Sequence, residues 1–271
     1  MSLTKRIDEA RKAFQKGDLD AAARAHDLKR ISGASKKHAE RHGGSSHQYI
    51  GDMVYGGLDG IVTTFAVVSG VAGADLGANI VLILGLANLF ADGFSMATGA
   101  FLSSKSEQEY YDRERRREAW EVEHFPEAEK AELHEIYIER GYTGEDAGRL
   151  VEVHTRDPKR WVDAMMIDEL GLLPDDRKPI LSALATFGAF VLAGSMPLIV
   201  YLLGLTFPIA PAVAFPVSLA LSAVALFGLG AAKVYVTGLN PLRSGIEMLL
   251  VGGLAAGVAY LVGTLLKNIG G

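Results

Sequence analysis

Apolar and charged residues are separated along this chain rather than mixed. Residues 53–102 and 180–267 are almost free of charge, whereas residues 1–51 and 103–180 hold nearly all of it. A soluble domain of this length mixes the two kinds of position throughout, so the separation indicates a membrane region joined to water-exposed parts. The pattern predicts an all-α, polytopic membrane protein.

The two apolar stretches divide into five segments, and each reaches the roughly 20 residues that a helix needs to cross a bilayer core. Helices are expected because lipid offers no hydrogen-bond partners for exposed backbone groups. Glycine and other small residues recur within the segments, which suits close helix packing in a bilayer. The predicted spans are Met53–Gly73, Ala78–Leu102, Ile180–Gly204, Pro211–Tyr235 and Gly245–Leu266.

The polar stretches complete a four-part organisation. Residues 1–51 are predicted to form a helical segment and a linker, and residues 52–102 the first two spans. Residues 103–179, here called the insert, are predicted to form a helical domain of their own, and residues 180–271 the last three spans.

Proline, glycine and threonine positions divide the insert into helices. A proline suits the first turn of a helix, a glycine its end, and Thr-Gly-Glu-Asp at residues 143–146 resembles a helix cap. The predicted helices are Ser103–His124, Pro126–Arg140, Thr143–His154 and Pro158–Leu170.

Basic residues predict the orientation of the chain. Of the 27 Lys and Arg residues, 11 lie in residues 1–51 and 13 in residues 103–180. The positive-inside rule then places the N-terminus and the insert in the cytosol and the C-terminus outside.

Composition removes several other classes of protein. The chain has no cysteine, which excludes disulfides, Cys-zinc sites and iron–sulfur clusters. The polar first 50 residues do not resemble a signal peptide. A net charge of −5 gives no indication of nucleic-acid binding.

The first span carries a carboxylate in apolar surroundings. Asp59 lies in VYGGLDGIVTTFAVVSG, and Asp52 lies seven residues earlier on the same helical face. A charge inside a bilayer is costly, and by default it marks a path for ions or protons. The alternatives are a structural acid paired with another helix for Asp59 and a position at the membrane interface for Asp52.

The second span places three ligand-type side chains on one stripe. Asn88, Asp92 and Met96 follow one another at intervals of four residues, which puts them on one face of a helix. Carboxylate oxygen binds harder divalent cations, and thioether sulfur adds affinity for softer ones. A methionine in a membrane helix usually only packs, but this stripe together with the neighbouring carboxylate favours passage of a metal ion.

The insert holds 21 of the chain's 32 acidic residues. A solvated acidic face is the ordinary explanation of such a run. Two helices joined at Pro126, however, are expected to lie antiparallel and to bring carboxylate pairs together. A Met-Met pair in RWVDAMMIDEL is also unusual unless it is buried or bound to something. The residues that stand out are Glu118, Glu121, Glu129, Glu132, Met165, Met166 and Glu169.

Three motifs resemble the vacuolar iron transporter family of proton-coupled metal exporters. They are YGGLDGIVTTFAVVSG in span one, ADGFSMATGAFLSSKSE in span two and the Glu-rich insert ending in DAMMIDELGL. The resemblance covers about Tyr49 to Leu266. Five spans with a long cytosolic insert between the second and third are also that family's arrangement.

The resemblance implies a homodimer whose translocation path runs between the first helices of the two subunits and is lined by Asp59 and Met96. It also implies that the seven Glu and Met residues of the insert gather metal. The insert has many acids, so a shift of individual ligands onto Glu107, Glu114 or Glu135 stays open. The segment before Tyr49 lies outside the resemblance, and its role is open.

From the residues and the resemblance we expect a secondary transporter, not an enzyme. It would carry divalent metal out of the cytosol, Fe²⁺ first, with Mn²⁺, Co²⁺ and Zn²⁺ fitting the same ligands. Protons would move the other way, and Asp59 can also carry them. Acidic ligands must lose protons to bind metal, which couples metal release to proton uptake. The metal is substrate and regulatory ligand, and no tightly bound cofactor is expected. The host membrane would be the cell membrane of a prokaryote or a vacuolar-type membrane of a eukaryote.

Two other functions remain open at this point. A membrane-anchored ferritin-like ferroxidase would need Glu-x-x-His motifs on two helices, and the insert has one, Glu121-x-x-His124. A sensor would bind metal through the same acids without transporting it.

Overall fold

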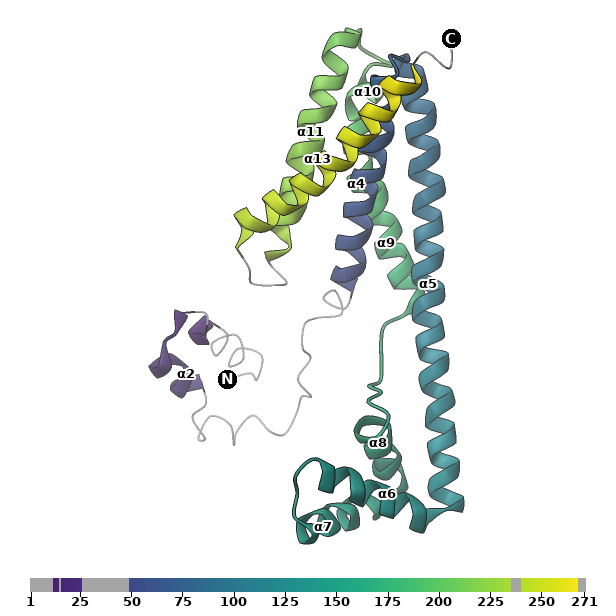
Figure 1. Ribbon diagram of the computed structural model, residues 1–271, viewed down its shortest axis with the longest axis vertical. Coiled ribbons are helices and arrows are strands. Elements are labelled where there is room, and N and C mark those ends of the chain that lie inside the picture. The colour runs from purple at the N-terminus through teal and green to yellow at the C-terminus, as the bar shows by residue number, and fades with distance from the viewer. Residues whose placement is uncertain (1–11, 15, 26–48, 235–239, 268–271) are drawn as a thin grey trace. The chain divides into compact units, whose positions relative to one another are not determined.

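The computed structural model describes residues 12–14, 16–25, 49–234 and 240–267. The chain divides into two compact units, Met1–Gln48 and Tyr49–Gly271. In the first unit, helix α2 runs from Leu19 to Ala25 (Figure 1). Asp18 caps it by accepting a hydrogen bond from the backbone N–H of Ala21 at 2.9 Å, as a residue before a helix is expected to do. Residues 1–11, 15 and 26–48 of the predicted N-terminal helical segment and linker lie outside the described residues.

The second unit is all-helical within the described part of the chain, and five of its helical segments are long and apolar enough to cross a membrane. This confirms the predicted multi-pass membrane protein. The five segments are α4 (Ile50–Gly73), α5 (Ala78–His124), α9 with α10 (Pro179–Gly194 and Ile199–Leu203), α11 (Pro211–Ala232) and α13 (Pro241–Leu266).

Helix α5 is longer than the sequence predicts. The predicted span Ala78–Leu102 and the predicted insert helix Ser103–His124 form one uninterrupted helix of 47 residues (Figure 1). Hydropathy changes sharply near Leu102, but neither proline nor glycine occurs between residues 100 and 125, so nothing ends the helix. The prediction of two separate helices was therefore wrong, and α5 runs from the apolar region into the insert.

The third span is not a single helix. Pro197 lacks an N–H, and a short 3₁₀ helix, Met196–Leu198, separates α9 from α10. The hydroxyl of Ser218 on α11 donates a 2.6 Å hydrogen bond to the carbonyl of Pro197, which pairs a buried backbone oxygen at the break. A broken helix is tolerated in a membrane where neighbouring helices satisfy its backbone.

Helix α4 packs closely against both α9 and α13 through glycines. A Cβ atom added at Gly60 would collide with the backbone carbonyl of Phe190 on α9. At the last residue of α4, a Cβ added at Gly73 would meet the backbone of Tyr260 on α13. Small residues allow helix backbones this close in a bilayer. Helix α4, which carries the first acidic motif, is therefore fixed on two sides.

We expect Gly60→Ala to lower the stability of the membrane region by about 1–3 kcal/mol, the usual cost of overpacking a close contact. Gly188→Ala is a matched control, because that glycine lies inside α9 with no neighbouring atom within 4 Å of an added Cβ. Thermal unfolding of the two purified variants checks this. An unfolding midpoint that falls equally in both would contradict the close approach of α4 and α9.

The insert has its own apolar core. Beyond the end of α5 it contains α6 (Pro126–Glu139), α7 (Gly144–Thr155) and α8 (Pro158–Asp168), which confirms the predicted helix bounds to within one or two residues. Thr143 caps α7 as predicted, accepting a hydrogen bond from the N–H of Asp146 at 3.2 Å. The buried core side chains include Val122, Leu133, Tyr137, Val151, Trp161, Met165 and Met166.

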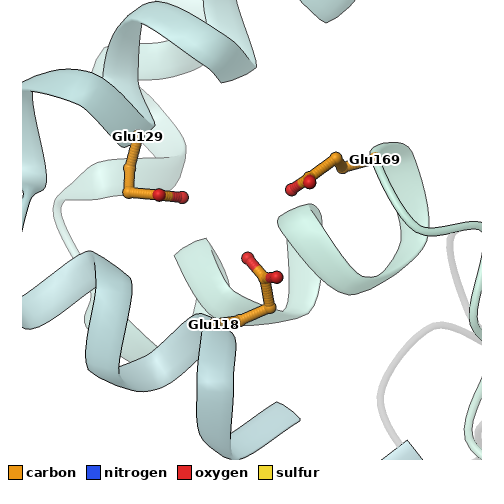
Figure 2. A group of neighbouring side chains, drawn as sticks. All are labelled: Glu118, Glu129 and Glu169. Carbon is orange, nitrogen blue, oxygen red and sulfur yellow. The ribbon is translucent and has the colours of Figure 1, made fainter. Parts of the chain in front are cut away.

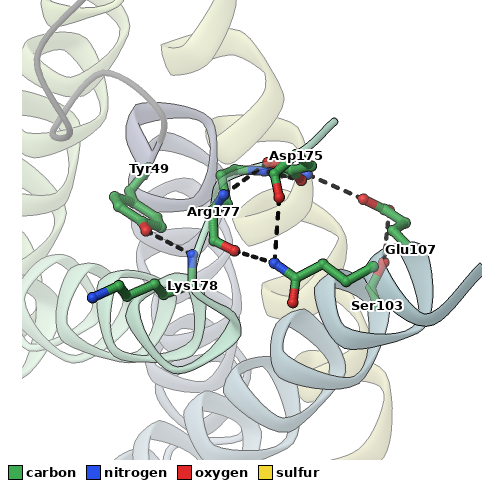
Figure 3. A network of polar contacts seen from close by, with 7 residues as sticks. Tyr49, Ser103, Glu107, Asp175, Arg177 and Lys178 are labelled. Atoms are coloured by element: carbon green, nitrogen blue, oxygen red, sulfur yellow. Dashed lines mark hydrogen bonds and ion pairs between the residues drawn. The ribbon is translucent and has the colours of Figure 1, made fainter. Parts of the chain in front are cut away.

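Polar contacts attach the connection between α8 and α9 to the neighbouring helices (Figure 3). The backbone N–H of Lys178 donates to the hydroxyl of Tyr49, just before α4, at 2.9 Å. Arg177 forms ion pairs with Asp175 at 2.8 Å and with Glu107 of α5 at 3.1 Å. The side chain of Gln108 donates to the carbonyls of residues 175 and 177. These bonds hold the end of the insert against α5 at the level where α4 begins.

Candidate metal-binding and transport sites

The predicted path residues lie on α4 and α5. Asp59 is half-buried on α4, and its carboxylate lies within electrostatic reach of that of Asp92 on α5. In the described part of the chain, no side chain donates a hydrogen bond to the Asp59 carboxylate and no cation pairs with it. The described residues therefore offer no partner for the alternative in which Asp59 forms a structural ion pair. Two acids on adjacent helices without a counter-cation suit a path for a cation.

The neighbours of this acid pair differ in their surroundings. Met96 is half-buried and packs against the apolar core of the membrane region. The side-chain nitrogen of Asn88 is buried and has no hydrogen-bond partner. Asp52 lies in the first turn of α4, with one buried, unpartnered carboxylate oxygen, and its charge reaches Arg177. Asp52 is therefore placed at the junction with the insert rather than beside Asp59.

A second group of acids gathers in the insert. Carboxylate oxygens of Glu118, Glu129 and Glu169 all lie within 4.8 Å of one another. Glu118 comes from α5, Glu129 from the first turn of α6, and Glu169 follows the last residue of α8. Figure 2 shows the three carboxylates pointing toward one common space. Oxygen ligands from three helices in this arrangement suit a hard or borderline divalent cation.

Burial makes this group unusual. Glu118 is 0% and Glu129 6% exposed, and buried carboxylate oxygens of both residues have no hydrogen-bond partner. A carboxylate buried without a partner is costly, unless a cation or a proton neutralises it. The group is therefore not the solvated acidic face that the sequence alone allowed.

The other predicted ligands of the insert lie near this group or in the apolar core of the insert. The charges of Glu121 and Glu132 act on Glu129, so both lie close to it. Met165 and Met166 are completely buried in the apolar core of the insert. The Met-Met pair is thus explained by burial, and its part in binding metal stays a prediction.

The alternative ligands have other partners or surroundings. Glu107 pairs with Arg177, and Glu114 pairs with Arg113 at 2.6 Å and with Arg117 at 3.0 Å. Glu135 is exposed on α6. These three acids lie outside the carboxylate group, which contains Glu118, Glu129 and Glu169, and the assignment of the ligands stays a prediction.

Burial and like charges raise the pKa values of the grouped acids. Burial, followed by the charge of Glu169, raises the pKa of Glu118 to about 7. Burial, followed by the charge of Glu132, raises the pKa of Glu129 to about 7. The pKa of Glu169 is also raised, again mainly by burial. Near neutral pH these groups can therefore exchange protons for a metal.

We expect metal binding by the insert to weaken steeply on acidification. With two carboxylates of pKa about 7, apparent affinity should fall about 100-fold from pH 8 to pH 6, or about tenfold for each proton displaced. Titration calorimetry with Mn²⁺ on the full-length protein checks this. An affinity that stays constant over this range would contradict the raised pKa values.

The stability of the metal-free protein should increase on acidification, whereas its metal affinity decreases. A raised pKa favours the protonated folded form, so the stabilisation is full below the ordinary Glu value of 4.5 and is lost as pH rises through about 7. Added Mn²⁺ should restore stability above pH 7, where the carboxylates are free to bind it.

The fold has five apolar spans, and two acids without a counter-cation in the described residues lie within the first two of them. Together with the buried carboxylate group of the insert, these features define a multi-pass membrane protein with sites suited to divalent cations. The chain belongs to the VIT family, whose model matches residues 50–264. The family model ends within a few residues of the limits that the three motifs indicated.

Curated relatives agree with this assignment. The chain is 40% identical to a vacuolar iron transporter of Toxoplasma gondii, over 98% of this chain and 90% of the relative. It is 33% identical to one from Plasmodium falciparum over 98% of both chains. It is 35% identical to vacuolar iron transporter 1 of Arabidopsis thaliana, over 85% of this chain and 91% of the relative. These relatives are named as transporters and not as enzymes.

The first two alignments include most of the segment before Tyr49. The similarity thus extends further toward the N-terminus than the sequence motifs alone indicated. The Arabidopsis alignment covers a smaller share of the chain.

Proposed function

We propose that this protein exports divalent transition metal, with Fe²⁺ as the first candidate, from the cytosol in exchange for protons. The insert collects the metal through its carboxylates, and Asp59 and Asp92 pass it through the membrane region with help from Asn88 and Met96. The observation that carries the proposal combines two groups of acids: the buried acids of the insert, whose oxygens lack hydrogen-bond partners, and the two acids on α4 and α5, which have no counter-cation in the described part of the chain. The named function of the relatives supports metal transport, with iron as the substrate.

The proposed orientation places the N-terminus and the insert in the cytosol. The basic-residue count supports it. Two spans precede the insert, so the insert and the N-terminus lie on the same side, and five spans put the C-terminus on the other side. Asp75, just after α4, pairs with Lys267, just after α13, at 2.9 Å, so the ends of the first and fifth spans lie on one side. A cysteine at Ser106, an exposed residue of α5 in a chain without cysteine, should then react with impermeant reagent from the cytosolic side.

We further propose a homodimer with the path between the two copies of α4. Asp59 is only half-buried within one chain, which suits a path that a second copy completes. Mn²⁺, Co²⁺ and Zn²⁺ are proposed as further substrates because the same oxygen and sulfur ligands accept them. No tightly bound cofactor is needed for this activity.

The geometry of the insert does not favour the ferroxidase alternative. His124 of the Glu-x-x-His motif is exposed, stacks on Trp120 with ring centroids 4.5 Å apart, and contacts the carbonyl of that residue at 2.8 Å. The carboxylate group contains Glu residues from three helices but no histidine. A ferritin-like site takes a Glu-x-x-His motif from each of two helices.

Metal uptake by proteoliposomes tests the proposed function. We expect Fe²⁺ or Mn²⁺ to reach a metal-quenched dye inside the vesicles faster than in protein-free liposomes, with no oxygen consumption beyond that of Fe²⁺ alone. Metal binding without uptake would make the protein a sensor. Oxygen consumption that depends on the protein would make it a ferroxidase.

A further inference from the structure

Arg117 is a cation built into the acidic group, and the sequence pattern does not single it out. Its guanidinium lies 3.0 Å from Glu114, 2.7 Å from Glu118 and 2.9 Å from Glu121. The three acids stand three residues before it, directly after it and four residues after it on α5. One side chain thus spans the acids on this face of the helix.

The three contacts differ in kind. Arg117 donates hydrogen bonds to Glu114 and to Glu121. The contact with Glu118 is close but does not have hydrogen-bond geometry, and both oxygens of Glu118 stay without a hydrogen-bond partner. Arg117 therefore neutralises part of the charge of Glu118 while leaving its lone pairs free for another ligand.

The charge of Arg117 reaches the whole group. It acts on Glu118, Glu129 and Glu169, the three acids whose oxygens converge. Three other basic side chains of the insert pair with acids outside this group. Arg115 pairs with Asp163, Lys130 with Glu127 and Arg140 with Asp168.

Arg117 can also leave the group. Its side chain is 43% exposed, whereas that of Glu118 is 1% exposed. A long, half-exposed side chain can turn into water while the buried carboxylate stays in place, because its backbone belongs to the continuous helix α5.

We propose that Arg117 is an internal counter-cation that an arriving divalent metal must displace from Glu118 and Glu121, and that it keeps the affinity of the insert low enough for release. This inference rests on the proposed function of the insert as the metal collector. A dication and a guanidinium repel each other at this range, so the arginine that balances the empty group opposes the loaded one. Arg117 is thus a residue that sets affinity, not a metal ligand.

The test is titration calorimetry on the full-length protein with Mn²⁺ at pH 8. Arg117→Gln should bind Mn²⁺ about tenfold or more tightly, because a unit charge near the metal is removed in a medium of moderate dielectric. Arg117→Lys keeps the charge, so its Mn²⁺ affinity should stay much closer to that of the unmodified protein than the affinity of Arg117→Gln does. Arg149→Gln is the matched control, since Arg149 forms a similar pair with Glu145 four residues away on α7, at 2.6 Å, outside the group.

Transport provides a second readout that a merely structural role would not produce. In proteoliposomes, Arg117→Gln should lower both the KM for Mn²⁺ and the maximal rate, because tighter binding slows release from the insert. A KM that rises, or an affinity that is unchanged in Arg117→Gln, would overturn the proposal.

These experiments distinguish failure of the proposed collector function from failure of the proposed role of Arg117. If the unmodified protein binds no Mn²⁺ in the insert, the proposed collector function fails and this inference fails with it. If the unmodified protein binds Mn²⁺ and Arg117→Gln does not bind more tightly, only the counter-cation role fails. Arg117→Met serves as a second neutral variant. Loss of the folded state in both neutral variants would make Arg117 a structural residue and overturn the proposal.

Discussion

Asp59→Asn is expected to reduce metal flux in proteoliposomes to the level of protein-free liposomes. The substitution keeps the shape of the side chain and removes its charge from the middle of α4. The charge of Asp92 acts on Asp59, and neither acid has a counter-cation in the described part of the chain, so together they offer the negative charge that a dication needs inside a bilayer. With one charge removed, the metal would lose half of that compensation where hydration is weakest.

The controls for Asp59→Asn use the same helix. Asp75→Asn makes the same chemical change just after α4, where the carboxylate is exposed and paired with Lys267, and it should keep most of the flux. Asp59→Glu should keep part of the flux because the carboxylate is retained. The insert of Asp59→Asn should still bind metal in calorimetry. Normal flux in Asp59→Asn would contradict the proposed path.

The second large effect is expected in the insert. Replacing Glu118, Glu129 and Glu169 together by Gln should abolish the tightest Mn²⁺ binding, because the converging oxygens lose their charge. The variant should also be more stable than the unmodified protein at pH 8 without metal. Buried carboxylates that repel each other destabilise the folded state once they ionise, and the amides remove that repulsion.

A matched triple variant distinguishes loss of the metal site from loss of surface charge in general. Glu127, Glu145 and Glu152 are exposed acids of the same insert, and each pairs with a Lys or Arg three or four residues further along the chain. Their joint replacement by Gln removes the same charge but should leave Mn²⁺ binding nearly unchanged, since surface pairs of this kind contribute little. Equal loss of binding in both triple variants would mean that metal is held by general acidity.

Most of the helices could be predicted because the residues that end helices are explicit in the sequence. Pro126, Gly141 and Pro158 separate the insert helices, and long apolar runs mark the spans. The continuity of α5 was missed because hydropathy changes where the backbone does not. The break at Pro197 was hidden by an apolar run that continues on both sides of it.

The sites were predictable in kind but not in geometry. A carboxylate in an apolar helix identified Asp59 directly, because its cost in lipid follows from the sequence. The closeness of Asp59 to Asp92, and the convergence of three acids in the insert, depend on helix packing that spacing on single helices cannot provide. Arg117 was missed because a basic residue in a run of mixed charges resembles any surface arginine. The available signal in the sequence was the spacing of the acids around Arg117, which stand three residues before it, directly after it and four residues after it.

The proposed function requires that metal and protons exchange across the membrane through this protein. Its most direct test is a proteoliposome assay that follows a metal-quenched dye and a pH dye inside the same vesicles while a Mn²⁺ gradient is imposed. We predict that metal flowing into the vesicles drives protons out, so that the interior becomes alkaline at a rate proportional to metal uptake, and that both signals disappear in Asp59→Asn. Metal uptake with an unchanged interior pH in the unmodified protein would contradict proton-coupled exchange.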